Sequence, residues 1–195
     1  MTSTISSRII TIMTQAESDI IIRCQGGDKD AFRWVVNTYQ QMVFSLALKM
    51  LCDEDEAKDI VQETFIRVWL SMRDYDTQRT FTTWLYTIAS RLCLDRLKRK
   101  THIVVLSGDE RVLRRIAGDT DHQRTLENSE WVSIVRLMAA QLSPKQKLVF
   151  TLSHLEGLSS EEVEHITGMD ARQVKSNLYE AKQKIRKRLK ELGYG

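Results

Sequence analysis

The sequence predicts an all-α protein with two small helical domains joined by a linker, and three observations support this fold class. Residues that interrupt helices are rare, since the 195-residue chain contains one proline and eight glycines. Apolar residues recur at steps of three and four, which is the spacing of one helix face. Residue types that start and stop helices mark short segments near the C-terminus.

The composition is that of a globular protein, with 42% hydrophobic and 28% charged residues. No apolar run approaches the roughly 20 residues that span a bilayer, and no secretion signal is recognisable. We therefore expect a cytoplasmic protein without membrane insertion. The histidines and cysteines lack ligand spacing, so no metal site, cofactor or disulfide framework is indicated. The cysteines are Cys24, Cys52 and Cys93.

Residues 1–13 are predicted to be an N-terminal extension or alternative start region, because Met13 offers a second start. A first helix is predicted from Asp28, a suitable N-cap after two glycines, to about residue 50. Its apolar stripe comprises Phe32, Val35, Val36, Tyr39, Met42, Val43, Leu46 and Met50.

The second predicted helix begins in the acidic stretch "DEDEAKDIVQET", where carboxylates in the first turn match the helix dipole. Its buried stripe comprises Ala57, Ile60, Val61, Thr64, Phe65 and Val68. Its outward face carries Asp55, Asp59, Gln62, Glu63 and Ile66. That face would suit a basic helix of a protein partner, but the residues alone favour a solvated charged surface.

A third helix is predicted over residues 81–100, with Phe81, Trp84, Leu85, Ile88 and Leu92 on one face. It combines aromatic rings with the basic end "RLKRK", and single-stranded DNA requires rings for stacking and cations for its phosphates. The periodicity favours core positions for Phe81 and Trp84 and leaves Tyr86 undecided.

Residues 101–130 show no long helical period and are predicted to be the interdomain linker, with a short helix near residues 112–116. Residues 131–195 carry 11 basic and 7 acidic side chains, a net charge of +4. This last segment is therefore the electrostatic candidate for binding a phosphate backbone.

Three capped helices are predicted in the C-terminal segment. The first is predicted to start at Ser143 and Pro144 and to stop at Gly157. The second is predicted to start with Ser159 and Glu162 as a capping box and to stop at Gly168, and the third is predicted to start at Asp170. A short capped helix, a tight turn and a longer basic helix make a helix-turn-helix. The outward residues of the last helix suit base edges and phosphates: Arg172, Gln173, Lys175, Ser176, Tyr179, Lys182 and Arg186.

The sequence does not predict an enzyme. It contains no phosphate-binding glycine motif, no GxSxG nucleophile motif and no HExxH zinc motif. No general acid–base pair is indicated either, so no catalytic residue is proposed.

Three segments carry a family resemblance. "DEAKDIVQETFIRVW" resembles the core-polymerase-binding helix of bacterial sigma factors, and "TFTTWLYTIASRLCLDRLKRK" resembles their promoter-melting and −10-recognition helix. "LSPKQKLVFTLSHLEGLSSEEVEHITGMDARQVKSNLYEAKQKIRKRL" resembles their −35-binding domain. The order of the motifs and the short length are similar to the extracytoplasmic-function (ECF) group of the sigma-70 family.

The resemblance implies a transcription initiation factor that binds core RNA polymerase, directs it to −35/−10 promoters and promotes melting. Residues 14–100 would form sigma domain 2 and residues 131–195 sigma domain 4. The implied partners are the β′ clamp helices and β flap of the polymerase, promoter DNA and an anti-sigma factor.

The resemblance also assigns the candidate residues to three sites. The implied polymerase-binding residues are Asp55, Asp59, Gln62, Glu63, Phe65 and Ile66. The implied −10 residues are Tyr75, Thr80, Phe81, Trp84, Tyr86, Arg91, Arg96, Lys98, Arg99 and Lys100. The outward residues of the last helix, from Arg172 to Arg186, would contact the −35 element.

The sequence departs from the family pattern in both DNA-reading helices. Ser90 and Arg91 stand where the family often has Arg-Asn, so a different base preference at −10 is expected. Asn177, Glu180 and Lys182 replace three arginines that the family often has. Because Glu180 would repel phosphate, we expect weaker phosphate contact at −35.

Two other function classes remain open on the sequence. A conventional helix-turn-helix regulator would bind its operator tightly without polymerase. A helical partner-binding protein without a DNA role would show no salt-dependent DNA affinity.

Overall fold

The computed structural model describes residues 17–76, 80–107, 141–191 and 193, and the regular elements in these ranges are all helical. The all-α prediction is therefore confirmed for the described part of the chain. After a helical segment at residues 17–25, the elements are α2 (Lys29–Leu51), α3 (Glu54–Ser71), η1 (Met72–Asp74), α4 (Phe81–Ser107), α7 (Pro144–Phe150), η2 (Thr151–Leu155), α8 (Ser160–Thr167) and α9 (Ala171–Glu191).

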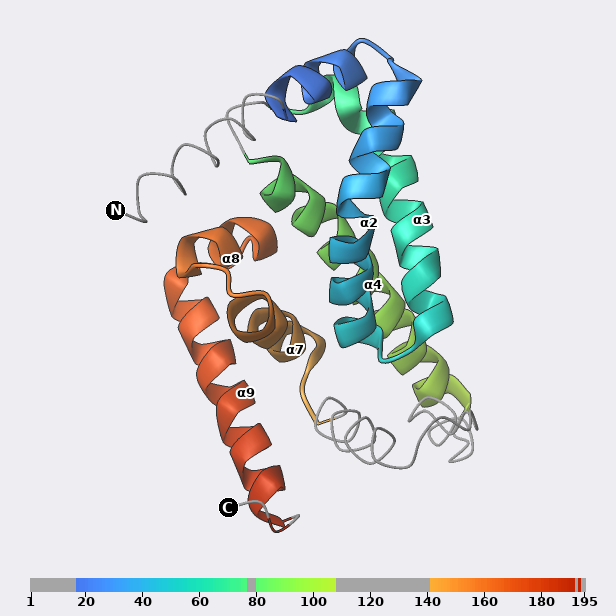
Figure 1. Cartoon of the computed structure of the whole chain (residues 1–195). Coiled ribbons are helices and arrows are strands. Elements are labelled where there is room, and N and C mark those ends of the chain that lie inside the picture. Colours follow the sequence, from blue (N-terminus) through green and yellow to red (C-terminus); the bar gives the residue numbers. More distant parts are fainter. Residues whose placement is uncertain (1–16, 77–79, 108–140, 192, 194–195) are drawn as a thin grey trace, which may run out of the picture.

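Helices α2, α3 and α4 pack together as an N-terminal bundle (Figure 1). The predicted cap Asp28 is confirmed, because its carboxylate accepts hydrogen bonds from the backbone N–H groups of Asp30 and Ala31. Asp53 caps α3 in the same way. The residues that fill the centre of the bundle are Val35, Val43, Leu46, Met50, Ile60, Val68 and Leu85.

Helix α4 is longer than the sequence analysis predicted, because it continues past residue 100 to Ser107. The segment 101–107 contains neither glycine nor proline, so nothing in it interrupts the helix. The mixed composition of residues 101–130 as a whole concealed this local helical preference. The short helix predicted near residues 112–116 lies outside the described residues, and the domain boundaries remain predictions.

The C-terminal caps follow the sequence closely. Capping boxes are present at Ser143 with Gln146 and at Ser159 with Glu162. Helix α8 ends at Gly168, whose φ of 69° places it in the left-handed region. One detail was not predicted: α7 continues into a single turn of π-helix, η2, before the chain reaches Gly157.

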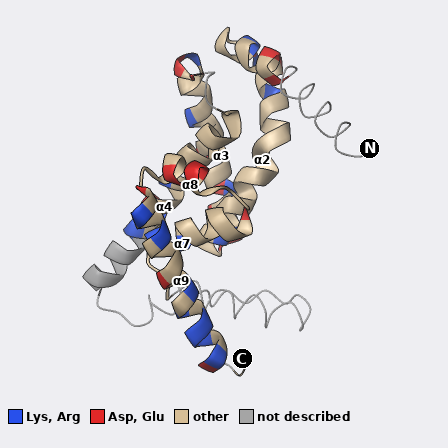
Figure 2. Cartoon of the chain, turned by 90° about the vertical axis from the view of Figure 1, so that its left-hand side faces the viewer, with Lys and Arg blue, Asp and Glu red and all other residues tan. Residues whose placement is uncertain are grey.

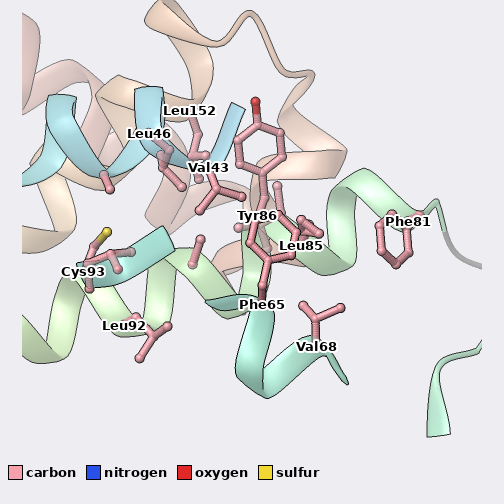
Figure 3. Packing of buried hydrophobic residues seen from close by; sticks show 14 of the residues in the cluster. Val43, Leu46, Phe65, Val68, Phe81, Leu85, Tyr86, Leu92, Cys93 and Leu152 are labelled. Atoms are coloured by element: carbon pink, nitrogen blue, oxygen red, sulfur yellow. The ribbon is translucent and has the colours of Figure 1, made fainter. Parts of the chain in front are cut away.

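The N-terminal bundle and the C-terminal helices share one apolar core, which the sequence did not predict. Helices α7 and α8 pack against α4, and η2 packs against α2 (Figure 1). The core therefore joins Val43, Leu46 and Tyr86 of the bundle to Leu152 and Val163 of the C-terminal helices. Figure 3 shows the Tyr86 ring pointing from α4 toward the C-terminal helices, near Leu152.

Candidate functional site

Helix α3 presents a row of residues to solvent along one face. Asp55, Asp59, Gln62 and Ile66 follow one another at helical spacing, and Leu70 continues the row one turn further. The two apolar members are strongly exposed, at 59% for Ile66 and 75% for Leu70. The face therefore changes from acidic at the start of α3 to apolar at its end.

An open groove of about 590 Å³ lies between this apolar end and α2. Its walls include Gln62, Ile66 and Leu70, while Phe65 is only 6% exposed and supports the groove from below. The full lining is Lys29, Phe32, Gln62, Phe65, Ile66, Trp69 and Leu70. The structure thus places Gln62, Phe65 and Ile66 at one groove, and their contact with polymerase stays a prediction.

The acidic residues of α3 differ in how they are paired. Glu63 forms an ion pair with Arg67 at 2.6 Å, and Asp55 lies 3.5 Å from Lys58. Asp59 is exposed and has no ion pair within the described part of the chain. Asp59 is therefore the carboxylate of this face that is most available to a basic partner.

Several of the −10 candidates belong to a cluster of aromatic rings at the start of α4. The Tyr75 ring lies 4.7 Å from Trp84 and 5.5 Å from Phe81, measured between ring centroids. Phe81 also packs against Tyr39 at 5.3 Å. Burial raises the pKa of Tyr75 to about 12, so its hydroxyl remains protonated at neutral pH.

The exposure of these rings divides the −10 candidates into buried and accessible residues. Phe81 and Tyr75 are buried, which agrees with the core position that periodicity favoured for Phe81, whereas Trp84 is half-buried. Thr80 precedes them and is exposed. In this conformation, Thr80 and part of Trp84 can meet a ligand directly, and the two buried rings support them.

Tyr86 lies in a different environment from the other aromatic candidates. It is 6% exposed, and its hydroxyl donates a hydrogen bond of 2.9 Å to Oε2 of Glu156. Burial is the largest cause that raises the pKa of Tyr86 far above its usual value, and the Glu156 carboxylate adds to it. Tyr86, which periodicity left undecided, thus lies at the contact between the two halves of the chain.

The basic candidates of α4 are mostly exposed, although Lys98 lies 3.8 Å from a carboxylate oxygen of Asp95. Arg91, Lys98 and Arg99 are exposed. Arg96 instead forms an ion pair with Glu56 of α3 at 2.7 Å, with both side chains about a quarter exposed. The side chain of Lys100 lies outside the described residues. Arg96 therefore acts in this structure as a link between α3 and α4.

The outward face of α9 is available for contact. Arg172, Lys175 and Ser176 are exposed, and Tyr179 is 65% exposed. Figure 2 shows that Lys and Arg residues, coloured blue, gather toward the C-terminal end of α9, the part of the helix that contains Arg186. On the opposite face of α9, the apolar residues Val174 and Ala181 are buried.

Gln173 has a second role that the sequence did not indicate. Its Oε1 accepts a hydrogen bond from the backbone N–H of Asp170, and the Asp170 carboxylate accepts one from the backbone N–H of Gln173. This reciprocal cap fixes the start of α9. The Nε2 group of Gln173 then remains as a donor toward a ligand.

Glu180 is attached to the C-terminal core rather than left free. Its Oε2 accepts a 2.6 Å hydrogen bond from Nε2 of Gln146 in α7, and its Oε1 lies 3.4 Å from the hydroxyl of Ser176. Lys184 binds the other side of Gln146 at 2.9 Å. These hydrogen bonds hold the Glu180 carboxylate against α7.

Lys182 is half-buried and lies close to the π-helical turn η2. Burial lowers the pKa of the His154 imidazole, and the Lys182 ammonium lowers it further. Both effects favour the neutral form of the imidazole over the charged form.

Sequence reasoning missed several residues that complete these surfaces. Trp69, Leu70 and Lys29 line the groove. The step of four from Ile66 to Leu70 was a signal for Leu70, but the remaining members belong to two helices and required the fold. Glu156, the partner of Tyr86, is 70 positions away in sequence and carried no local signal.

The described residues contain no group of three or more His, Cys, Asp or Glu side chains suited to a metal ion. Among the described helices, none combines the length and apolar character needed to cross a membrane.

Comparison with known families assigns both halves of the chain. Residues 35–103 match the Sigma-70 region 2 model and residues 133–185 match the Sigma-70 region 4 model. The sigma-E factor of Haemophilus influenzae, an ECF RNA polymerase sigma factor, is 31% identical over 89% of this chain and 95% of its own length. The chain belongs to the ECF sigma factors.

This ECF sigma factor has other relatives over nearly its whole length. The ECF sigma factor SigW of Bacillus subtilis is 28% identical over 85% of the chain and 92% of SigW. With this membership, the chain is a transcription initiation factor, and a conventional helix-turn-helix regulator is not favoured.

Solved structures support the fold of this sigma factor. CnrH, in a complex with the cytosolic domain of CnrY, aligns with a TM-score of 0.67 over 90% of this chain and 98% of CnrH, at 20% identity. The sigma factor RpoE of Bartonella quintana, in a complex with the anti-sigma factor NepR, aligns with a TM-score of 0.64 over 84% of this chain and 98% of RpoE, also at 20% identity.

Proposed function

We propose that this ECF sigma factor binds the core polymerase through α3. Helix α4 and the preceding loop would recognise and melt the −10 element, and α9 would recognise the −35 element. The observation that carries the proposal is the joined surface of α3, where exposed carboxylates lead directly into an apolar groove. Domain 2 would comprise residues 14–100 and domain 4 residues 131–195.

The α3 surface fits the β′ clamp helices of core polymerase. Asp59, which has no ion pair among the described residues, supplies negative charge for a basic helix, and Ile66 and Leu70 supply apolar area at the groove. An apolar anchor surrounded by charge is a typical arrangement for a specific protein interface. DNA would be repelled by the same carboxylates, so this face is suited to protein and not to the promoter.

The start of α4 is suited to an unpaired strand of the −10 element. Thr80 and Trp84 lie at the surface of the aromatic cluster, and Arg91, Lys98 and Arg99 are exposed cations along the same helix. Rings for stacking and cations for phosphates are what single-stranded DNA binding requires.

The exposed face of α9 is suited to the major groove of the −35 element. Arg172 and Lys175 can contact phosphates or base acceptors, and Gln173 offers its Nε2 as a donor. Glu180 lowers the phosphate attraction near the centre of the helix. The C-terminal helices would also contact the β flap, as the family resemblance implies.

The factor would act in the cytoplasm and would catalyse no reaction itself, since polymerase forms the phosphodiester bonds. An anti-sigma factor is the expected regulator. The relative RpoE of Bartonella quintana was solved with such a partner, and we extend that type of partner to this chain.

The decisive experiment is transcription in vitro with core polymerase and a genomic template, followed by mapping of start sites. We expect the purified chain to direct initiation at a defined set of promoters. A parallel gel shift should show promoter binding with core enzyme and weak binding without it. Tight binding by the chain alone, with no effect of polymerase, would instead support the conventional regulator.

A further inference from the structure

A mostly buried carboxylate forms polar contacts between the two halves of the chain. Glu156 follows the π-helical turn η2, and its side chain is only 10% exposed. Its Oε1 forms a 2.7 Å ion pair with Nζ of Lys49 on α2, and its Oε2 accepts the 2.9 Å hydrogen bond from Tyr86 on α4. Both oxygens of this carboxylate are thus used to connect the C-terminal helices to the N-terminal bundle.

Apolar contacts reinforce this connection. Leu148, Val149 and Leu152 are each at most 1% exposed, and they belong to the same core as the bundle. Lys147 of α7 is 9% exposed, and its Nζ lies 3.7 Å from the Cys52 thiol. The C-terminal helices are therefore docked on α2 and α4 and do not stand apart.

Docking covers the Tyr86 side of α4 and leaves the −35 face of α9 open. Tyr86, a −10 candidate, is 6% exposed beneath the C-terminal helices, and Ser90 one turn further along α4 is 2% exposed. The reading face of α9 remains exposed, as the 65% exposure of Tyr179 shows. A −10 strand that contacts the Tyr86 side of α4 requires the C-terminal helices to move away.

We propose that Glu156, with Lys49 and Tyr86, is a latch that holds the free sigma factor closed and limits its access to the −10 strand. The latch rests on the proposed role of α4 at −10. Its opening releases the Tyr86 side of α4, while the −35 face is accessible in both states. The apparent affinity for the −10 strand is then reduced by the fraction of closed molecules.

The test compares four full-length proteins: wild type, Glu156→Gln, the exchanged pair Lys49→Glu with Glu156→Lys, and Asp30→Asn. Glu156→Gln keeps the size of the side chain and removes its charge. The exchanged pair restores opposite charges at the same two positions. Asp30→Asn is the matched control, because it removes the same charge from an exposed ion pair within α2, Arg33 with Asp30 at 2.9 Å.

The first measurement is the radius of gyration by small-angle X-ray scattering, which needs no DNA. We expect Glu156→Gln to be larger than wild type and the exchanged pair and control to match wild type. Circular dichroism on each protein confirms that the helices are retained. Equal radii for Glu156→Gln and Asp30→Asn would overturn the latch, whatever the proteins do with promoters.

The second measurement is the affinity of the free proteins for a single-stranded oligonucleotide with the non-template −10 sequence of a mapped promoter. We expect Glu156→Gln to bind about fivefold more tightly than wild type, and the control to be unchanged. An expanded Glu156→Gln variant with unchanged affinity would overturn the gating of −10 access. Failure of the proposed function is recognised separately, because wild type would then start no transcripts with core polymerase.

Discussion

At the scale of single residues, exposure and pairing separate candidates that the sequence treated alike. Asp59 and Glu63 both lie on the acidic helix, but Glu63 is paired with Arg67, whereas Asp59 has no ion pair in the described part of the chain. Trp84 and Phe81 are both aromatic −10 candidates, but only Trp84 is partly exposed. A contact residue must be accessible, so Asp59 and Trp84 are the stronger members of each pair.

The first residue-scale prediction concerns the apolar end of α3. Ile66→Asp should weaken binding to core polymerase about tenfold or more, ~1.4 kcal/mol, because it places a charge in an apolar contact. The matched control is Ile22→Asp, since Ile22 is 58% exposed and Ile66 is 59% exposed. Titration of labelled protein with core enzyme measures both. Equal weakening by the two variants would exclude the groove as the polymerase contact.

The second residue-scale prediction concerns Glu180. Glu180→Gln removes a negative charge near the DNA while an amide can still meet Gln146, so affinity for −35 duplex should rise about threefold at low salt. The gain should shrink as salt is added. Glu54→Gln, an equal change of charge in α3, serves as control. Fluorescence anisotropy over a salt series measures both, and a similar gain in the control would refute a local effect.

At the scale of elements, the sequence predicted where helices begin and end, but it did not predict which helices pack against one another. Asp28, Ser143 and Ser159 cap helices through bonds to residues two or three positions away, so the sequence contains the whole interaction. The groove instead needs Phe32 from α2 and Trp69 from α3, whose rings lie 4.8 Å apart. Such contacts depend on packing between helices, which periodicity alone does not define.

The element-scale prediction concerns the turn between α8 and α9. Gly168 has a φ of 69°, and an added Cβ would meet no atom within 4 Å. Gly168→Ala should therefore cost about 1 kcal/mol through backbone strain alone. Gly168→Asn should cost less, since asparagine tolerates the left-handed region. Guanidinium unfolding monitored by circular dichroism measures both; equal losses would contradict strain as the cause.

At the scale of the whole molecule, the sequence predicted two helical domains but not their contact. The bond between Tyr86 and Glu156 joins residues 70 positions apart, and each residue alone resembles an ordinary surface or core position. Tyr86 and Cys93 lie outside the apolar face predicted for the third helix. In the structure, Tyr86 and Cys93 are buried in the core that the bundle shares with the C-terminal helices, which explains why these positions are apolar.

The whole-molecule prediction concerns thiol reactivity. Cys52 is half-buried, whereas Cys24 is 2% exposed and Cys93 is fully buried, with a pKa raised by burial to about 12. Iodoacetamide at pH 8 should therefore modify Cys52 about tenfold faster than the other two. Mass spectrometry of the peptides measures this order, with the guanidinium-unfolded chain as control. Rapid modification of Cys93 in the folded protein would contradict its burial.

The shared core has a consequence for how the molecule melts. Because Leu152 and Val163 complete a core that contains Leu46 and Leu85, the C-terminal helices cannot lose their structure without exposing apolar area on the bundle. The two regions should then unfold cooperatively, as one calorimetric unit with equal van't Hoff and calorimetric enthalpies. Wild type should give a single heat-capacity peak, and Glu156→Gln should divide it into two.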